Sequence, residues 1–171
     1  MKVSVLTVSD RSARGEREDK SGPVLVEIIQ AHRWNLVDTQ IVPDDQQEIE
    51  NILRKWADSG DVDLILTTGG TGFSPRDRTP EATRNVVDRL APGLAEAMRL
   101  ASIKITPHAM LSRAVAGLRC GTLIVNLPGS PKAAKENLEV ILPALPHAIQ
   151  LLSDDPDAES GHYPGIARRQ I

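Results

Sequence analysis

A glycine-rich turn is the stretch of this sequence best suited to chemistry. Three glycines fall within residues 69–72, directly after the apolar run Leu64–Leu66, which has the pattern of a strand buried on both faces of a parallel sheet. Closely spaced glycines let the backbone turn sharply and bring its N–H groups near a ligand, most readily an anion. A helix start follows, with Thr79 predicted as N-cap and Pro80 at the first helical position. Strand, glycine turn and helix N-terminus together predict a phosphate-binding site. The residues assigned to it are Gly69, Gly70, Thr71 and Gly72.

The same four residues are also compatible with an ordinary tight connection between a strand and a helix. Short glycine motifs are common, and this one matches neither the phosphate loop that ends in Gly-Lys-Ser/Thr nor the dinucleotide spacing Gly-x-Gly-x-x-Gly. The charged run Arg76-Asp77-Arg78 favours the functional interpretation. Because Thr79 is expected to cap the helix, Asp77 has no predicted structural role and becomes a candidate for the chemistry.

Asp44 is a second candidate carboxylate, at the end of the strand predicted over residues 34–42. The helix that follows could begin with Asp45 and Glu48 as a capping box, which would leave Asp44 free. Alternatively, Asp44 itself caps the helix with Gln47 at the third position. The sequence leaves both alternatives open.

A second glycine turn lies in the same sequence context as the first, between a strand pattern and a helix start. Asn126-Leu127-Pro128-Gly129-Ser130-Pro131 follows a strand pattern, and Ser130 and Pro131 are predicted as N-cap and first residue of a helix. This gives a second helix terminus that favours an anion. By contrast, residues 11–20 are predicted to form a solvated polar loop, and Arg113 to be a surface or interface residue.

The predicted fold is a single three-layer α/β domain with a mostly parallel sheet covered by helices on both faces. Strand patterns at residues 3–9, 34–42 and 64–66 are separated by helical patterns, which indicates right-handed parallel crossovers. Two short strands, 114–118 and 122–126, form a hairpin-like unit. Helices are expected from Pro80 to Leu90 and from Leu94 to Ile103, and a further helix is kinked or restarted at Pro143. Residues 105–112 are expected to be irregular. The domain is predicted to cover residues 1–152, with 153–171 as a tail. Four strands should end at one edge of the sheet and gather their loops into one cleft, at Asp10, Asp44, Gly69 and Pro128.

The amino-acid composition argues against nucleic-acid binding, zinc binding and membrane insertion. The chain has 171 residues, 40% of them hydrophobic and 25% charged, with a formal net charge of −3 and four aromatic residues (two Trp, one Tyr, one Phe), so neither a basic face nor stacking rings for a nucleic acid are expected. An acidic protein that binds phosphates usually needs a metal cation as well. A single cysteine and four scattered histidines give no zinc spacing, and Cys120 is expected to be a small apolar residue near a strand. The chain starts directly on a strand pattern and contains no run long enough to span a bilayer, so a cytoplasmic protein is predicted.

Several motifs together resemble the molybdopterin adenylyltransferases of the MogA/MoaB type, which include the N-terminal domain of gephyrin. The resemblance runs from the first strand to residue 148, but it thins over residues 11–20 and after 153. The motifs that carry it are Thr67-Thr68-Gly69-Gly70-Thr71-Gly72, Pro75-Arg76-Asp77, Thr79-Pro80-Glu81-Ala82-Thr83, Asn126-Leu127-Pro128-Gly129-Ser130 and Pro107-His108-Ala109-Met110-Leu111-Ser112-Arg113.

The resemblance implies a Mg²⁺-dependent reaction in which molybdopterin phosphate attacks the α-phosphorus of ATP, giving adenylylated molybdopterin and pyrophosphate. It places the functional aspartates at Asp44 and Asp77, with Asp77 as a Mg²⁺ contact, and the nucleotide loop at 69–72. Gly70→Val is therefore expected to weaken ATP binding without disturbing the fold. The resemblance also implies a homotrimer and leaves a molybdate-insertion enzyme open as a further partner. A molybdopterin carrier or an oligomeric scaffold without turnover remains the alternative. The residues expected to bind molybdopterin are Ser9, Asp10, Pro128, Gly129 and Ser130.

Overall fold

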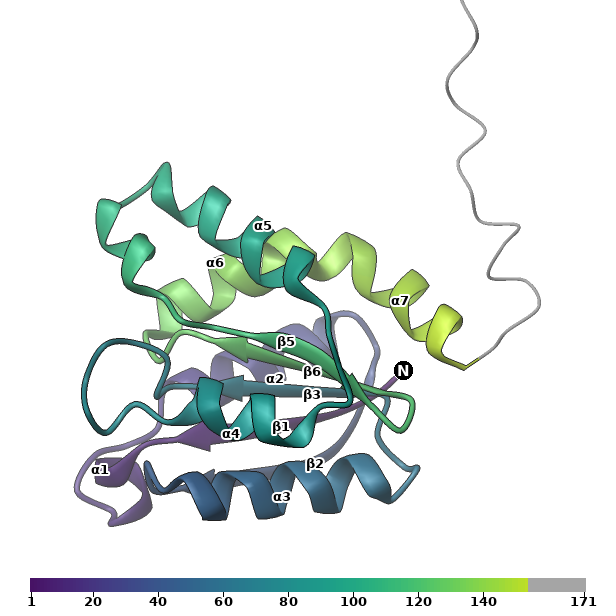
Figure 1. The fold of residues 1–171 in the computed structure, drawn as a ribbon, viewed down its shortest axis with the longest axis horizontal. Helices are drawn as coiled ribbons and strands as arrows, with labels where there is room; N and C mark the ends of the chain where they lie inside the picture. The colour runs from purple at the N-terminus through teal and green to yellow at the C-terminus, as the bar shows by residue number, and fades with distance from the viewer. Residues whose placement is uncertain (154–171) are drawn as a thin grey trace, which may run out of the picture.

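The computed structural model describes residues 1–153 and contains one six-stranded sheet in the order β2-β1-β3-β6-β5-β4 (Figure 1). The strands are β1 (Lys2–Val8), β2 (Asn35–Val42), β3 (Leu64–Thr68), β4 (Arg89–Leu90), β5 (Ala116–Arg119) and β6 (Thr122–Leu127). The helices are α1 (Asp10–Ala13), α2 (Ser21–Ala31), α3 (Gln46–Asp58), α4 (Thr79–Val86), α5 (Pro92–Ile103), α6 (Pro131–Ile141) and α7 (Leu145–Leu152). Two 3-10 helices complete the set, η1 (Pro107–Leu111) and η2 (Leu142–Ala144).

Helices cover both faces of the sheet, as predicted for a three-layer domain. One core joins alternate residues of the central strands, such as Leu64 and Leu66, to α2, α5, α6 and α7. On the other face Ile65 lies in a second core with α3 and α4. Because all five residues of β3 are buried, this strand needs apolar or small hydroxylic side chains on both faces, which its sequence Leu-Ile-Leu-Thr-Thr supplies.

The four strands β2, β1, β3 and β6 are parallel, so their carboxyl ends meet at one edge of the sheet. They end at Val42, Val8, Thr68 and Leu127, each followed within two residues by a predicted site segment. The antiparallel pairs β5–β6 and β4–β5 finish the other side of the sheet. The predicted α/β architecture and the common edge for the cleft loops are therefore confirmed.

Local predictions failed at three segments. The helix expected to continue to Leu90 ends at Val86, and Arg89–Leu90 pair with β5 instead, which leaves the Leu90 side chain 57% exposed rather than directed inward. Residues 10–13 form the short helix α1, capped by Ser9, where a loop was expected. Residues 107–111 form η1 where irregular chain was expected. Residues 89–90 and the start of α1 are held by tertiary hydrogen bonds, to β5 and to Asp44, whereas η1 is held by local bonds around Thr106 and Ala109.

Pro143 restarts the C-terminal helix as predicted, since α6 passes through η2 into α7. The predicted tail lies outside the described residues from position 154 onward. Within residues 1–153 no helix has the length and hydropathy needed to cross a bilayer.

Candidate active site

The first glycine turn is packed against the ends of two neighbouring strands. Gly69 has φ +100° and Gly70 has φ +62°, both in the region that side chains disfavour. The Gly69 N–H donates to the carbonyl of Leu127 at 3.2 Å, and a Cβ atom on Gly69 would lie 2.2 Å from the carbonyl oxygen of Val8. Only glycine fits here without moving the strand ends.

The second glycine turn touches the first. A Cβ atom on Gly129 would lie 3.1 Å from the Cα of Gly69, so the two main chains pass closely and a side chain at Gly129 would crowd the first turn. The Thr68 hydroxyl donates to the carbonyl of Pro128 at 2.7 Å and ties the two turns together. The structure thus places both predicted anion-binding turns side by side.

A cleft of about 850 Å³ opens above these turns and brings together most of the predicted site residues. It includes both candidate aspartates, two glycines of the first turn, and two residues of the second. Predicted residues that line this cleft are Ser9, Asp10, Asp44, Gly69, Gly70, Asp77, Gly129 and Ser130. The remaining three, Thr71, Gly72 and Pro128, line a separate pocket of about 290 Å³ against α5, η1 and α6. The predicted site residues therefore line two different pockets, and the first glycine turn contributes residues to both.

Of the two helix termini at the cleft, α6 begins as predicted, with Ser130 as N-cap and Pro131 first, whereas α4 does not begin as predicted. Thr79 is not the N-cap of α4: the N-cap is Arg78, and the Thr79 hydroxyl, fully buried, donates to the carbonyl of Gly69 at 2.8 Å. Thr79 therefore supports the glycine turn instead of the helix. Ser130 is the N-cap of α6, but its side chain makes no capping hydrogen bond. Because Pro131 has no N–H, the N–H groups that Ser130 leaves uncapped are those of Lys132 and Ala133, which do not line this cleft.

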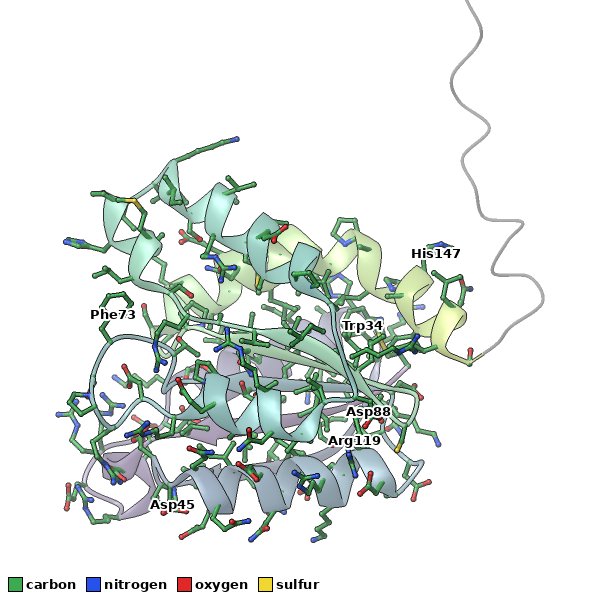
Figure 2. The ribbon with its side chains drawn as sticks, viewed as in Figure 1. Trp34, Asp45, Phe73, Asp88, Arg119 and His147 are labelled. Carbon is green, nitrogen blue, oxygen red and sulfur yellow. The ribbon has the colours of Figure 1, made fainter. Side chains whose placement is uncertain are left out.

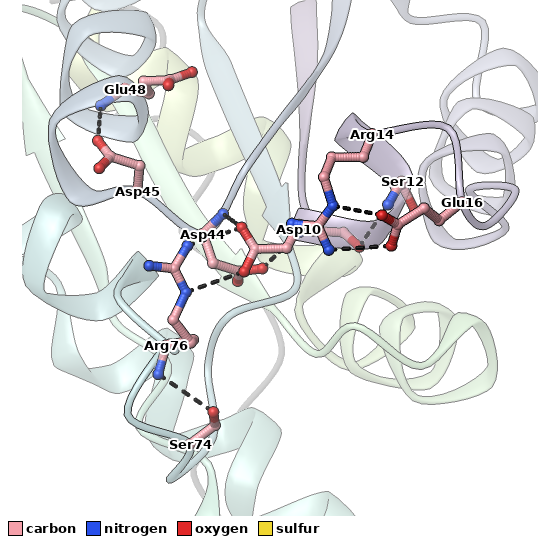
Figure 3. A network of polar contacts seen from close by, with 10 residues as sticks. Asp10, Ser12, Arg14, Glu16, Asp44, Asp45, Glu48, Ser74 and Arg76 are labelled. Atoms are coloured by element: carbon pink, nitrogen blue, oxygen red, sulfur yellow. Dashed lines mark hydrogen bonds and ion pairs between the residues drawn. The ribbon is translucent and has the colours of Figure 1, made fainter.

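Asp44 and Asp10 bind each other's main chain across the ends of β2 and β1. Asp44 Oδ2 accepts the N–H of Asp10 at 2.7 Å, and the N–H of Asp44 donates to Asp10 Oδ1 at 3.0 Å (Figure 3). Asp45 is the residue that caps α3, accepting the Glu48 N–H at 3.0 Å. The cap of α3 is therefore Asp45 and not Asp44, as the first alternative held, but Asp44 is not free, because its carboxylate holds the Asp10 N–H.

The two carboxylates have opposite electrostatic surroundings. Burial raises the pKa of Asp44, and the nearby carboxylates of Asp10 and Asp77 raise it further. The pKa of Asp10 is lowered because Arg76 binds it through two hydrogen bonds, from Nε to Oδ2 at 3.0 Å and from Nη2 to Oδ1 at 2.8 Å (Figure 3). Arg76 thereby fastens the loop after the glycine turn to the end of β1.

Asp77 has a structural contact that the sequence did not reveal. Its Oδ2 accepts the N–H of Ser74 at 3.0 Å, and its own N–H donates to the carbonyl of Ser74 at 2.9 Å. The expectation that Asp77 lacks a structural role is therefore wrong. The same carboxylate still lines the cleft, so Asp77 both closes a turn and faces the site.

Sequence reasoning missed the charged rim of the cleft, formed by the segment expected to be a solvated loop. Four cations of this segment line the cleft together with Glu18 and Asp19, and they are Arg11, Arg14, Arg17 and Lys20. Arg14 is paired with Glu16 at 2.7 Å, and Arg17 donates to the Ser9 hydroxyl at 3.2 Å. The remaining two cations form no ion pair with any residue in 1–153. The sequence feature that could have indicated this rim is the presence of four cations within residues 11–20. The acidic residues between them, Glu16, Glu18 and Asp19, made the segment look like an ordinary loop of mixed charge.

Two further predictions are incomplete or wrong at single residues. Arg113 is only partly exposed, and its side chain contacts the loop that carries Asp77, a role that the sequence did not indicate. Cys120 is exposed in the turn between β5 and β6, with φ +48°.

Gly70→Val cannot have the purely local effect expected from the sequence. A Cβ atom at Gly70 would lie 2.5 Å from Thr79 Oγ1 and 3.1 Å from Asp44 Oδ1. Even Gly70→Ala is expected to lower the free energy of unfolding by about 2 kcal/mol or more, because positive φ and the lost Thr79 contact act together. Gly60→Ala is the matched control, since Gly60 has φ +72° and open space around its Cβ position. Urea denaturation should show a clearly larger loss for Gly70→Ala; equal losses would mean that packing at Gly70 is unimportant.

Comparisons with known proteins agree with this geometry. Residues 4–147 match a family model described as a probable molybdopterin binding domain. Gephyrin from Dictyostelium discoideum is 46% identical over 164 residues, which cover 90% of this chain but only 23% of gephyrin. A molybdopterin adenylyltransferase from Helicobacter pylori (strain J99) is 43% identical over 152 residues, covering 88% of this chain and 86% of that protein. The crystal structure of the molybdopterin biosynthesis enzyme MoaB from Thermus thermophilus matches with a TM-score of 0.85 and 53% identity, covering 91% of this chain and 98% of that one.

The match to the family model includes both glycine turns and both cleft aspartates, and it covers most of the chain. The structural match at 53% identity extends over the whole sheet and its helices. On these grounds the chain belongs to the family of probable molybdopterin binding domains.

Proposed function

We propose that this protein transfers AMP from ATP to the phosphate of molybdopterin, giving adenylylated molybdopterin and pyrophosphate. The observation that carries the proposal is that two glycine turns and two carboxylates face one cleft. Its volume, about 850 Å³, lies in the upper part of the range typical of small-molecule sites and suits two ligands that meet at their phosphates. The names of the adenylyltransferase and MoaB relatives support the same assignment.

The cleft suits the phosphates of both substrates in a specific way. The main chain at Gly69 and Gly70 comes to the cleft surface without side chains, and the positive end of the α6 dipole also faces the cleft region, since Ser130 and Pro131 line it. Arg11, Arg17 and Lys20 add positive charge to the cleft lining. These groups hold the anions close together, which their mutual repulsion would otherwise prevent.

The donor set also fits Mg²⁺. Asp44 and Asp77 present carboxylate oxygens to the same cleft, and Mg²⁺ is commonly bound by one or two carboxylates together with substrate phosphates. The pKa of Asp44 is raised by burial and by its carboxylate neighbours, the situation that a bound cation relieves. Residues 1–153 contain no cluster of three or more metal-ligating side chains, so the remaining ligands would be phosphate oxygens and water. When bound, Mg²⁺ would neutralise charge on the reacting phosphates.

The chemistry itself is a substitution at phosphorus. A phosphate oxygen of molybdopterin forms a bond to the α-phosphorus of ATP, while the bond from that phosphorus to the oxygen bridging the α- and β-phosphates breaks and pyrophosphate leaves. The protein contributes by orienting the two phosphates through the glycine turns, holding its carboxylates in place through Asp10 and Ser74, and surrounding the anions with N–H groups and cations.

The test is to measure pyrophosphate release from ATP in the presence of Mg²⁺, with and without molybdopterin. We expect release that requires both molybdopterin and the metal, and that stops when EDTA removes the metal. Binding of molybdopterin without pyrophosphate release would contradict the transferase assignment and favour the carrier alternative.

We also propose that the protein is a homotrimer working in the cytoplasm. Support for assembly comes from a patch of exposed apolar side chains on and around α5 and η1, because such patches mark protein interfaces. Its members are Leu100, Ile103, Ile105, Met110 and Leu111. Light scattering should give three times the 18.6 kDa mass of one chain, and a monomer would contradict this proposal.

A further inference from the structure

Arg113 binds the loop between the glycine turn and α4 at both ends. Its N–H donates to the carbonyl of Thr71 at 2.9 Å, and Nε donates to the carbonyl of Gly72 at 2.6 Å. At the far end of the loop, Nη2 donates to the carbonyl of Asp77 at 2.7 Å. Nη1 pairs with Glu81 in the first turn of α4. One guanidinium therefore links the start of the loop, its end and the helix that follows.

The loop held in this way carries Asp77 and Arg76, both of which reach the cleft side. Asp77 lines the cleft, and Arg76 binds Asp10 at the end of β1. Arg113 itself does not line the cleft; it lies behind the loop, in a shallow pocket with Phe73 and Arg78. Its contacts are with main-chain carbonyls, so they set the path of the backbone from which the Asp77 side chain projects.

We propose that Arg113 is a positioning residue that holds the Asp77 carboxylate in the cleft by fixing both ends of residues 72–77. The inference rests on the proposed AMP transfer, because Asp77 is assigned to that chemistry. Arg113 binds the two loop ends and Glu81 with one planar group, and a shift of the carboxylate by about 1 Å is enough to cost up to a hundredfold in rate. The effect of Arg113 should therefore appear in turnover and not in ATP binding.

The structure also offers a matched structural arginine. Arg119 donates Nε and Nη2 to Asp58 at 2.8 and 2.9 Å and Nη1 to the carbonyl of Val86 at 3.0 Å. It is 18% exposed at its side chain, compared with 30% for Arg113. Figure 2 shows Arg119 beside Asp88, at the opposite end of the sheet from Phe73 in the loop. Arg119→Ala removes a similar clamp without touching the cleft.

Glu81 allows the ion pair to be separated from the loop contacts. Arg113→Ala alone leaves Glu81 without its partner, and Glu81 Oε2 already lacks a hydrogen bond within the described chain. The double variant Arg113→Ala with Glu81→Gln removes that unpaired charge but still lacks the carbonyl contacts. Glu81→Gln alone keeps them. If the loop contacts matter, the double variant should be as slow as Arg113→Ala, and Glu81→Gln should be nearly as fast as wild type.

The experiment measures kcat and KM for ATP in these variants, together with hydrogen exchange of residues 72–78. We expect Arg113→Ala to lower kcat by about ten- to a hundredfold with KM changed by less than about threefold. Exchange at the Asp77 N–H should accelerate, because its hydrogen bond to Ser74 depends on the loop path. Arg119→Ala should keep wild-type kcat and loop exchange. Added guanidinium should restore part of the turnover of Arg113→Ala.

Failure of the inference can be told apart from failure of the proposed function. Wild-type protein that binds ATP but releases no pyrophosphate with molybdopterin would overturn the function, and with it a catalytic role for Arg113. Normal wild-type turnover with unchanged kcat and loop exchange in Arg113→Ala would overturn the inference alone. Equal losses of kcat in Arg113→Ala and Arg119→Ala would show a general loss of stability and would likewise overturn it.

Discussion

Asp77→Asn is expected to lower the rate of adenylylation by about a hundredfold or more. The substitution keeps the size of the side chain and an oxygen that can accept the Ser74 N–H, but it removes the negative charge from the cleft. Losing one preorganised electrostatic contact of this kind commonly costs about 3 kcal/mol of transition-state stabilisation. Single-turnover formation of adenylylated molybdopterin at saturating Mg²⁺ is the appropriate measurement, because it reports the chemical step.

Two controls accompany Asp77→Asn. Ser74→Pro removes the N–H that Asp77 accepts, together with the hydroxyl that accepts the Arg76 N–H, while leaving the carboxylate charge, so it tests the structural role of this turn without changing the charge of the cleft. Molybdopterin affinity should change much less than turnover in Asp77→Asn. Near wild-type turnover in Asp77→Asn would show that the catalytic assignment is wrong and would favour a carrier or scaffold function.

Asp44→Asn is expected to abolish most turnover without destabilising the fold. The asparagine oxygen can still accept the Asp10 N–H, so the link between β1 and β2 is retained. What is lost is the charge that, in the proposed function, faces Mg²⁺ and the phosphates. A fall of about a hundredfold is again expected. The informative comparison is between turnover and the free energy of unfolding in the same protein sample.

The pH dependence of stability gives Asp44 a distinctive signature. Burial and two neighbouring carboxylates raise its pKa above the ordinary value of an aspartate, so the folded protein holds this proton more tightly than the unfolded chain does. Stability contributed by protonated Asp44 is therefore present at low pH and is lost as pH rises through the raised pKa. At pH 7 the free energy of unfolding of Asp44→Asn should equal or exceed that of wild type, and its advantage should shrink as the pH falls below the raised pKa.

Asp45→Ala is the adjacent control. Asp45 caps α3 and does not line the cleft, so its loss should lower the free energy of unfolding by about 1 kcal/mol and leave turnover unchanged. The two substitutions should thus have opposite effects: Asp45→Ala lowers stability and not turnover, and Asp44→Asn lowers turnover and not stability. A stability loss for Asp44→Asn at pH 7 with normal activity would reverse their assigned roles.

The sequence predicted those parts of the molecule that depend on local pattern. Buried strands such as Leu64–Thr68 show apolar runs, and the glycine turns show where the chain must bend without side chains. The alternation of strands and helices predicted a parallel sheet, and from it the position of Asp44 and Gly69 at one edge of that sheet. The structure confirms both predictions.

Most of the errors concern contacts between residues distant in sequence, although the missed contact of Asp77 with Ser74 spans only three positions. Arg76 and Asp10 are 66 positions apart, and Arg113 is 41 positions from Gly72, so no local pattern could indicate that these side chains meet. Threonine is a residue type that N-cap positions favour, yet the buried hydroxyl of Thr79 donates to the carbonyl of Gly69 in the first glycine turn instead. Leu90 continues the helical spacing of α4, but residues 89–90 instead form an antiparallel pair with β5. Tertiary hydrogen bonding overrode local preference in both of these cases.

The parallel sheet also determines when the cleft can appear during folding. Asp10 and Asp44 are joined across 34 positions, and Thr68 and Pro128 across 60, so none of these contacts belongs to a local hairpin. Contacts of large sequence separation form late and slow the folding rate, since a long loop must close before they contribute. We therefore expect ligand affinity to return during refolding together with the parallel sheet and not before it.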